Sequence, residues 1–163
     1  PTLDNDVVYI GKNKVADKVN TGNELMDAGK LLLSPTRTYA PLMKLFIDEF
    51  FDKIDGAIHC SGGGQTKCMK YLPMPLKVVK NNLFKAPVIF DIIQQNSGAD
   101  NREMYQVFNM GHRLEIFTDE LTAARMIAMA SSMNIGAQII GFTEASVNKE
   151  LHIHAGNEWI KYM

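Results

Sequence analysis

The feature that most constrains this chain is a run of three glycines, Gly62 to Gly64, that follows a short apolar segment at 56–60 after one residue, Ser61. The apolar segment predicts a buried strand, and residues 65–71 predict a short helix. Residues without a Cβ let successive backbone N–H groups converge on an anion, and a helix N-terminus adds partial positive charge. His59 and Ser61 add polar groups beside the glycines. The run therefore indicates a phosphate-holding loop, with a tight or flexible turn as the alternative; it matches neither GxxxxGK[ST] nor GxGxxG.

Strand and helix signals alternate along most of the chain. Helical apolar spacing and capping residues predict helices at 41–51, 65–71, 87–95, 100–105 and 118–133. Short apolar or alternating runs predict strands at 31–33, 56–60, 77–80, 112–117 and 136–143, and a closing β-hairpin at 151–162. We therefore expect an α/β domain, close to α+β, in which a mixed β-sheet is layered with helices.

Three finer expectations concern individual elements. The strand at 77–80 follows two prolines and is expected at a sheet edge. Thr118 is expected to cap the helix that follows it. The helix at 41–51 should bury one apolar stripe with spacing i, i+3, i+4 and i+7, made of Met43, Phe46, Ile47 and Phe50.

Composition and charge exclude several classes of protein. The 163 residues include 17 Lys and Arg against 18 Asp and Glu, a net charge of −1, so no general field attracts nucleic acid or an acidic membrane. Hydrophobic residues make up 46% and charged residues 21%, the balance of an ordinary globular domain. No apolar run approaches the roughly 18 residues of a membrane helix, and no signal-peptide pattern is present, so we expect a cytoplasmic protein.

The first 29 residues differ from the rest. Residues 1–29 are polar and rich in Gly, Asn and Asp, whereas regular signals begin at Lys30. We interpret 1–29 as an N-terminal arm or linker and 30–163 as the folded domain. The chain begins at Pro1, which favours a fragment of a longer protein, although removal of an initiator Met would also expose Pro1.

A second polar loop lies between the predicted strand at 31–33 and the next helix. Thr36 and Arg37 stand there, at a strand end where ligands of open α/β sheets tend to bind. The Arg guanidinium suits a phosphate, but Thr36 would equally serve as a helix cap with Arg37 in solvent.

A third polar loop is the helix-to-strand corner at Asn109 and Gly111. The Asn amide there either bonds a ligand or completes the turn. His112 and Arg113 follow directly. Strand alternation predicts that these two side chains face opposite sides, so at most one of them would face a ligand at this corner.

The cysteines and paired histidines are interpreted as structural. Cys60 and Cys68 have no Cys/His pair at zinc-finger spacing, so we expect reduced thiols. A nucleophilic Cys60 would need an aligned base, yet neighbouring residues of a strand point oppositely. His152 and His154 share one strand face at a spacing that can bind zinc, but the sequence offers no third ligand nearby, so we expect a solvated hairpin face.

Three segments together resemble a known family in their order and spacing. They are LSPTRTYAPLMK (33–44), AIHCSGGGQTK (57–67) and EMYQVFNMGHRLEI (103–116). They are similar to the C-terminal half of aminoimidazole ribonucleotide synthetase, also called phosphoribosylformylglycinamidine cyclo-ligase, over roughly residues 30–144. The wider superfamily includes selenophosphate synthetase and thiamine-phosphate kinase, but these strings look most like the cyclo-ligase.

The resemblance implies an architecture and an activity. In that family an N-terminal domain forms much of a homodimer contact and packs on this α/β domain, with the active site in the cleft between them. ATP, with Mg²⁺, phosphorylates the formyl amide oxygen of formylglycinamidine ribonucleotide, an amidine nitrogen closes the imidazole ring, and ADP and phosphate leave. The implied partners are therefore ATP, a phosphorylated ribonucleotide, the enzyme's own N-terminal domain and a second copy, in cytoplasmic purine biosynthesis. Because ATP and Mg²⁺ are expected mainly on the N-terminal domain, this domain alone is expected to be inactive.

The resemblance also assigns roles to residues of this chain. His59 would be the catalytic contact, polar or proton-handling, beside the glycines, and no metal ligand is assigned. The sequence departs from the family at His112 and Arg113, where a small or apolar pair and a second Gly are usual. Residues assigned to substrate or phosphate binding are Thr36, Arg37, Ser61, Gly62, Gly63, Gly64, Asn109 and Gly111.

Two alternatives to the cyclo-ligase stay open. One is a non-catalytic module of the same superfamily that binds phosphate or nucleotide and has lost turnover. The other is an active, kinase-like superfamily member with a different phosphoryl or acyl acceptor.

Overall fold

A computed structural model describes residues 11–34, 37–72 and 75–163 of the chain. The fold is α/β with a mixed sheet layered against helices, as predicted. Within the described residues the strands form a β1–β2 hairpin, a β3–β5 pair and a four-stranded sheet of order β6-β4-β7-β8. The strands are Lys18–Asn20 (β1), Leu25–Asp27 (β2), Gly56–His59 (β3), Leu76–Lys80 (β4), Leu114–Phe117 (β5), Gly141–Ala145 (β6), Glu150–Ala155 (β7) and Glu158–Tyr162 (β8).

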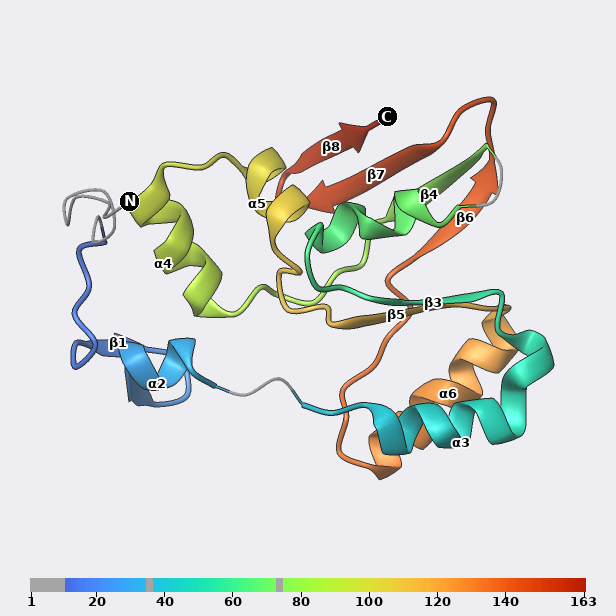
Figure 1. The fold of residues 1–163 in the computed structure, drawn as a ribbon, viewed down its shortest axis with the longest axis horizontal. Helices are drawn as coiled ribbons and strands as arrows, with labels where there is room; N and C mark the ends of the chain where they lie inside the picture. The colour runs from blue at the N-terminus through green and yellow to red at the C-terminus, as the bar shows by residue number, and fades with distance from the viewer. Residues whose placement is uncertain (1–10, 35–36, 73–74) are drawn as a thin grey trace, which may run out of the picture.

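The described residues form five α-helices and two 3₁₀ turns. They are Ala28–Leu32 (α2), Ala40–Phe50 (α3), Val88–Ser97 (α4), Asn101–Val107 (α5) and Glu120–Ser132 (α6), with 3₁₀ turns at Phe51–Lys53 (η1) and Gly64–Lys70 (η2). Figure 1 shows the β3–β5 ribbon between the four-stranded sheet and the α3–α6 pair. None of the helices in the described ranges has the length and apolar character needed to cross a lipid bilayer.

The four-stranded sheet is mixed because β4 pairs with β7 in parallel and with β6 antiparallel. The predicted edge position of β4 is therefore wrong, since β4 has a partner on both sides. Pro75 precedes the strand and leaves its hydrogen-bond ladder intact. The predicted closing hairpin is confirmed, with Ile153 opposite Ile160.

Two separate apolar clusters pack against opposite faces of the β3–β5 pair. Ile58 of β3 belongs to the cluster beside the four-stranded sheet, whereas Ile116 of β5 packs against the cluster between α3 and α6. The first, here called the sheet core, comprises Ile58, Cys60, Cys68, Leu72, Val78, Leu151, Ile153, Ala155, Ile160 and Tyr162. The second, the helix core, comprises Leu42, Phe46, Phe50, Met126 and Ala130.

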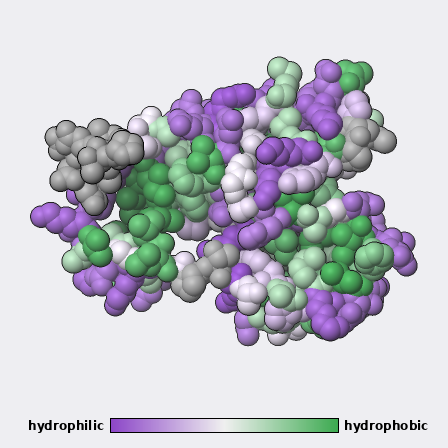
Figure 2. Space-filling view, in the orientation of Figure 1, coloured by the Kyte–Doolittle hydropathy of each residue, from purple (hydrophilic) through white to green (hydrophobic). Residues whose placement is uncertain are grey.

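Helix α3 buries a slightly different stripe from the one predicted. Leu42, Phe46 and Phe50 are each 3% exposed and follow an i, i+4, i+8 row, the row that packs against another helix. Ile47, placed in the predicted stripe, is 46% exposed, so that part of the prediction is wrong. Figure 2 shows apolar groups at the surface over the end of α3, where Phe51 is also exposed.

Helix α6 begins one residue later than predicted. Its cap is Asp119, whose Oδ1 accepts a hydrogen bond from the Thr122 N–H at 2.9 Å. Thr118, the predicted cap, instead donates its hydroxyl to the Lys53 carbonyl at 2.7 Å. A carboxylate complements the positive helix N-terminus better than a hydroxyl, which explains the choice.

Two predicted strands differ from the observed elements. Residues 31–33 end helix α2 and the turn after it, and Leu32 and Leu33 are 65% and 79% exposed. An apolar run of three residues does not distinguish a strand from a helix end, which is why this prediction is wrong. Of the segment predicted as a strand at 136–143, only the part from Gly141 onward is β-structure. Helix α5 is confirmed, with Asp100 Oδ1 accepting from the Glu103 N–H at 2.7 Å.

Candidate functional site

The glycine loop, defined here as residues 61–64, is delivered by the end of strand β3. The β3–β5 pairing continues past the strand, since the Cys60 N–H donates to the Arg113 carbonyl at 2.8 Å. The loop then turns, and the Gly64 N–H donates to the Ser61 carbonyl at 3.0 Å. Gly63, with φ 90° and ψ 1°, occupies the third position of a type II turn, which requires a positive φ. Glycine at 63 is thus a backbone requirement.

Two of the three loop glycines expose their backbone to solvent. Gly62 and Gly63 are exposed, whereas Gly64 is buried and its N–H is taken by Ser61. Among the residues that the structure describes, none accepts a hydrogen bond from the N–H of Gly62 or Gly63. The predicted three-amide arrangement is therefore reduced to two amides available to an anion.

A lysine ammonium completes this surface. Lys67 Nζ donates to the His59 carbonyl at 2.9 Å and to Ser61 Oγ at 2.8 Å. No carboxylate in the described part of the chain forms an ion pair with it. An ammonium has three N–H donors, so one remains for a further acceptor. His59 itself ends β3 with an exposed side chain.

Asn109 holds the glycine loop from behind. Its Nδ2 donates to the Cys60 carbonyl at 3.2 Å, and its Oδ1 accepts from the Gly111 N–H at 2.9 Å. Both ends of the side-chain amide are therefore engaged within the protein. A Cβ added to Gly64 would lie 2.4 Å from the Phe108 carbonyl oxygen, so the backbones of Gly64 and Phe108 approach each other too closely for a side chain at position 64.

A buried polar network that was not predicted from the sequence lies beneath the loop. Gln65 Nε2 donates to the Asn109 carbonyl at 2.6 Å. Lys80 Nζ donates to Gln65 O at 2.9 Å, to Gln65 Oε1 at 3.0 Å and to Glu115 Oε1 at 2.7 Å. The three side chains belong to residues that are 0%, 1% and 5% exposed. The available signal was a charged residue within an apolar strand, as in Leu114-Glu115-Ile116.

The two cysteines beside this network are structural, as predicted. Both are free thiols, and Cys60 and Cys68 are 2% and 1% exposed. Burial, reinforced by the nearby Glu115 carboxylate, raises the pKa of Cys60 to about 12. A thiol with so high a pKa is a poor nucleophile near neutral pH, which argues against covalent catalysis here.

The paired histidines lie on the outer face of the closing hairpin. His152 Nε2 lies 3.0 Å from Glu150 Oε2, and the His154 ring stacks on Trp159 with centroids 4.9 Å apart. The described residues contain no group of three or more His, Cys, Asp or Glu side chains that could hold a metal.

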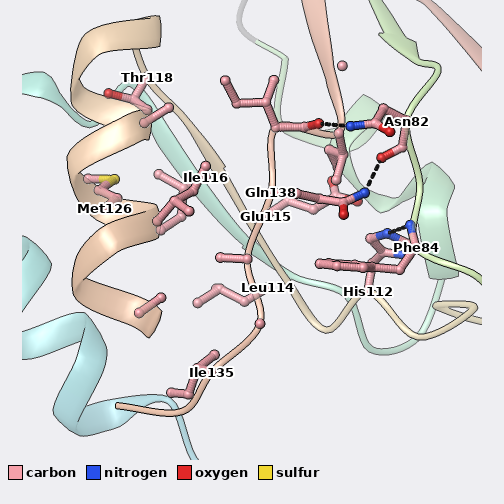
Figure 3. A pocket seen from close by; sticks show the side chains of 18 of the residues that line it. Asn82, Phe84, His112, Leu114, Glu115, Ile116, Thr118, Met126, Ile135 and Gln138 are labelled. Atoms are coloured by element: carbon pink, nitrogen blue, oxygen red, sulfur yellow. Dashed lines mark hydrogen bonds between the residues drawn. The ribbon is translucent and has the colours of Figure 1, made fainter. Parts of the chain in front are cut away.

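A separate cavity of about 740 Å³ opens between β5, α6 and the segment leading into β6. Figure 3 shows Met126 and Ile116 on one side of it and Asn82, Phe84 and His112 on the other. Gly111 lines it, with φ 98°; a Cβ there would lie 2.8 Å from Pro87 Cδ. Of the predicted site residues, Gly111 lines this cavity and the glycine loop does not.

His112 is buried beside this cavity. Its Nε2 accepts the Phe84 N–H at 2.9 Å, and its Nδ1 has no partner among the described residues. Burial, and then the positive charge of Lys80, lower the pKa of His112 to about 4. His112 and Arg113 both precede β5 and both line this cavity, and the expectation that their side chains face opposite sides stays a prediction.

The structure places Arg37 away from the glycine loop. Its Nη1 donates to the Asn134 carbonyl at 2.6 Å, just beyond α6. Thr36 lies outside the described residues. Of the predicted site residues, the fold therefore gathers His59, the glycine loop, Asn109 and, through Asn109, Gly111.

Comparison with known proteins finds no matching family model. Similar proteins are the phosphoribosylformylglycinamidine cyclo-ligases of Pseudothermotoga lettingae (31% identical, covering 82% of this chain) and Methanocaldococcus jannaschii (30%, covering 94%). The enzyme of the same name from Geobacillus thermodenitrificans is 34% identical over 69% of the chain. The matched region spans 39%, 43% and 33% of these relatives, respectively. The chain thus spans between a third and somewhat over two fifths of the length of these relatives.

Proposed function

Because the chain belongs to the phosphoribosylformylglycinamidine cyclo-ligase family, we propose that it forms the phosphate-holding part of such an enzyme. With the rest of the enzyme, it would close the imidazole ring of formylglycinamidine ribonucleotide, with ATP as the phosphoryl donor. The products would be aminoimidazole ribonucleotide, ADP and phosphate, as in purine biosynthesis.

The observation that carries this proposal is the exposed pair of amides at Gly62 and Gly63 beside the Lys67 ammonium. Unpartnered main-chain N–H groups and a cation on the same loop favour an anion with several acceptor oxygens, such as a phosphate. The chain carries a net charge of only −1, so this affinity would come from local geometry. A phosphate held there would be fixed relative to the reacting formyl group.

The proposed chemistry requires this chain to hold a substrate phosphate, to transfer a proton and to contact the substrate. Phosphorylation of the amide oxygen makes it a leaving group, the amidine nitrogen attacks the activated carbon, and the bond from that carbon to the phosphorylated oxygen breaks. The loop amides and Lys67 would hold a substrate phosphate. His59, exposed beside the loop, would accept or donate a proton. Gly111 lines the cavity and would contact the substrate there, and Arg37, two residues before the lining residue Tyr39, would contact it from the same side.

ATP and Mg²⁺ fit this chain differently. The loop amides and Lys67 suit a phosphate group of ATP or of the ribonucleotide substrate. The described side chains lack a cluster of three or more metal ligands, so this donor set does not fit Mg²⁺ by itself. We propose that the ion is held mainly elsewhere in the enzyme, with the ATP. We further propose that the whole enzyme has an N-terminal domain, from which residues 1–29 lead as an arm, and that it forms a homodimer through that domain. Its proposed location is the cytoplasm.

Titration of this chain with inorganic phosphate tests the loop. Phosphate should protect the wild-type chain against heating. Gly63→Val should remove that protection, because a β-branched residue strains the positive φ at this position. The fold should be kept, because the site is exposed. Equal protection of both proteins would exclude the loop as the phosphate site.

Coupled ADP release by the product of the whole open reading frame tests the reaction. Formylglycinamidine ribonucleotide should elicit ADP release, and His59→Ala should lower kcat/KM more than tenfold, about 1.4 kcal/mol. Phosphate binding without ADP release would favour the non-catalytic module, and release with another acceptor would favour the kinase-like alternative.

A further inference from the structure

We infer that the buried Lys80–Glu115 ion pair is a positioning device which, through Gln65, holds the glycine loop against the Asn109 turn in its anion-binding geometry. This inference rests on the proposed function, because it concerns the same phosphate site. None of the three side chains is assigned a role by the family resemblance.

Burial makes this ion pair costly. The Lys80 and Glu115 side chains are 2% and 4% exposed, so both charges have left water almost completely. Replacing a buried ion pair with apolar residues of similar size is often neutral or stabilising in proteins. Stability alone therefore gives little reason for two charges at this place, and a requirement for directed hydrogen bonds gives a better one.

The hydrogen bonds of Lys80 match its donors one for one. Its ammonium has three N–H groups, and three acceptors lie within 2.7 to 3.0 Å: Gln65 O, Gln65 Oε1 and Glu115 Oε1. Gln65 is thus held at both its backbone and its side chain. It directly follows Gly64, so this grip fixes the end of the glycine loop.

The network also ties the loop to the neighbouring turn. Gln65 Nε2 donates to the Asn109 carbonyl, and Asn109 Nδ2 donates to the Cys60 carbonyl at the start of the loop. Both ends of the loop are therefore held by one chain of bonds that begins on β4 and β5. Glycines are the most flexible residues, and fixing their backbone before a ligand arrives removes an entropic cost of binding.

The test compares two double variants that each remove one Lys and one Glu. Lys80→Met with Glu115→Leu removes the buried pair. Lys77→Met with Glu144→Leu removes a partly exposed pair that also starts on β4 and does not contact the loop. Each variant is titrated with inorganic phosphate and unfolded in urea. We expect the first to bind phosphate at least tenfold more weakly while still folded, and the second to bind within twofold of wild type.

Wild-type affinity in the folded Lys80→Met, Glu115→Leu protein would overturn the inference and leave the phosphate site standing. Absence of phosphate binding by the wild-type chain would instead overturn the proposed function.

If the first double variant does not fold, Gln65→Met decides, since it keeps a side chain of similar length and removes the contact with Asn109. A tenfold loss of phosphate affinity is expected there, and an unchanged affinity would contradict the inference. In the unmodified protein, ¹⁵N relaxation should give order parameters of about 0.85 for Gly62 and Gly63, the value of a rigid backbone. Values below about 0.6 would contradict the inference.

Discussion

The helix core and the network beneath the glycine loop organise buried side chains in opposite ways. The helix core joins α3 and α6 through apolar groups alone, whose contacts are non-directional. The network joins β4, β5 and η2 through Lys80, Glu115 and Gln65, where each contact has a defined donor and acceptor. Apolar packing supplies stability, and directed bonds fix the positions of atoms. Mutations in the two regions should therefore separate stability from phosphate affinity.

The largest effect on stability is expected in the helix core. Phe46→Ala should lower the free energy of unfolding by about 4 kcal/mol, because it opens a cavity at a residue only 3% exposed. The affinity of the remaining folded protein for phosphate should be unchanged, as measured by titration at low temperature. Ile47→Ala, at a position 46% exposed, is the matched control and should cost less than about 1 kcal/mol. Weaker phosphate binding by folded Phe46→Ala would contradict the separation of stability from phosphate affinity between the two regions.

The next effect is a dependence of stability on pH that arises at His112. Its pKa is about 4 in the folded chain against 6.5 ordinarily, so between pH 6.5 and 4 the unfolded chain binds a proton that the folded chain does not. Stability should therefore fall as the pH falls through this window, by on the order of 3 kcal/mol.

Urea unfolding at several pH values measures this effect against His112→Gln, which keeps an acceptor for the Phe84 N–H and does not titrate. The variant should lose the part of the slope due to His112. Parallel curves for the two proteins would show that His112 titrates normally.

A smaller effect on stability, with a large one on binding, is expected inside the glycine loop. Gly64→Ala places a methyl group 2.4 Å from the Phe108 carbonyl at a positive φ, so it should cost about 2 kcal/mol and weaken phosphate binding by moving the loop. Gly136→Ala lies outside the loop, meets no atom within 4 Å and serves as the control. Equal behaviour of the two variants in urea unfolding and phosphate titration would show that the close approach to Phe108 does not matter.

The smallest effect on the stability of this chain is expected at Arg37. Arg37→Ala removes one exposed hydrogen bond to the Asn134 carbonyl and should lower stability by less than about 1 kcal/mol. Phosphate affinity of the loop should not change, whereas kcat/KM of the whole enzyme should fall more than tenfold if the cavity side contacts the substrate. A loss of phosphate affinity in this chain would place Arg37 at the loop instead.

Local signals predicted much of the fold. Pro41 in the first turn of α3, the Asp100 cap of α5 and the alternating tail all act through neighbours a few residues away, so they were readable in the sequence. The failures have the opposite character. The edge position expected for β4 and the strand expected at 31–33 depended on partners that no local pattern specifies.

The sequence by itself determined the glycine turn, because only a residue without a Cβ adopts the backbone of Gly63 and permits the approach of Gly64 to Phe108. The sequence also determined the family resemblance, since the order and spacing of the three motifs are properties of the sequence alone. Only the tertiary structure decided which polar groups meet. Lys80, Gln65 and Glu115 lie on separate elements, and their partnership arises because folding removes all three from water together, where an unpaired charge would be too costly to keep.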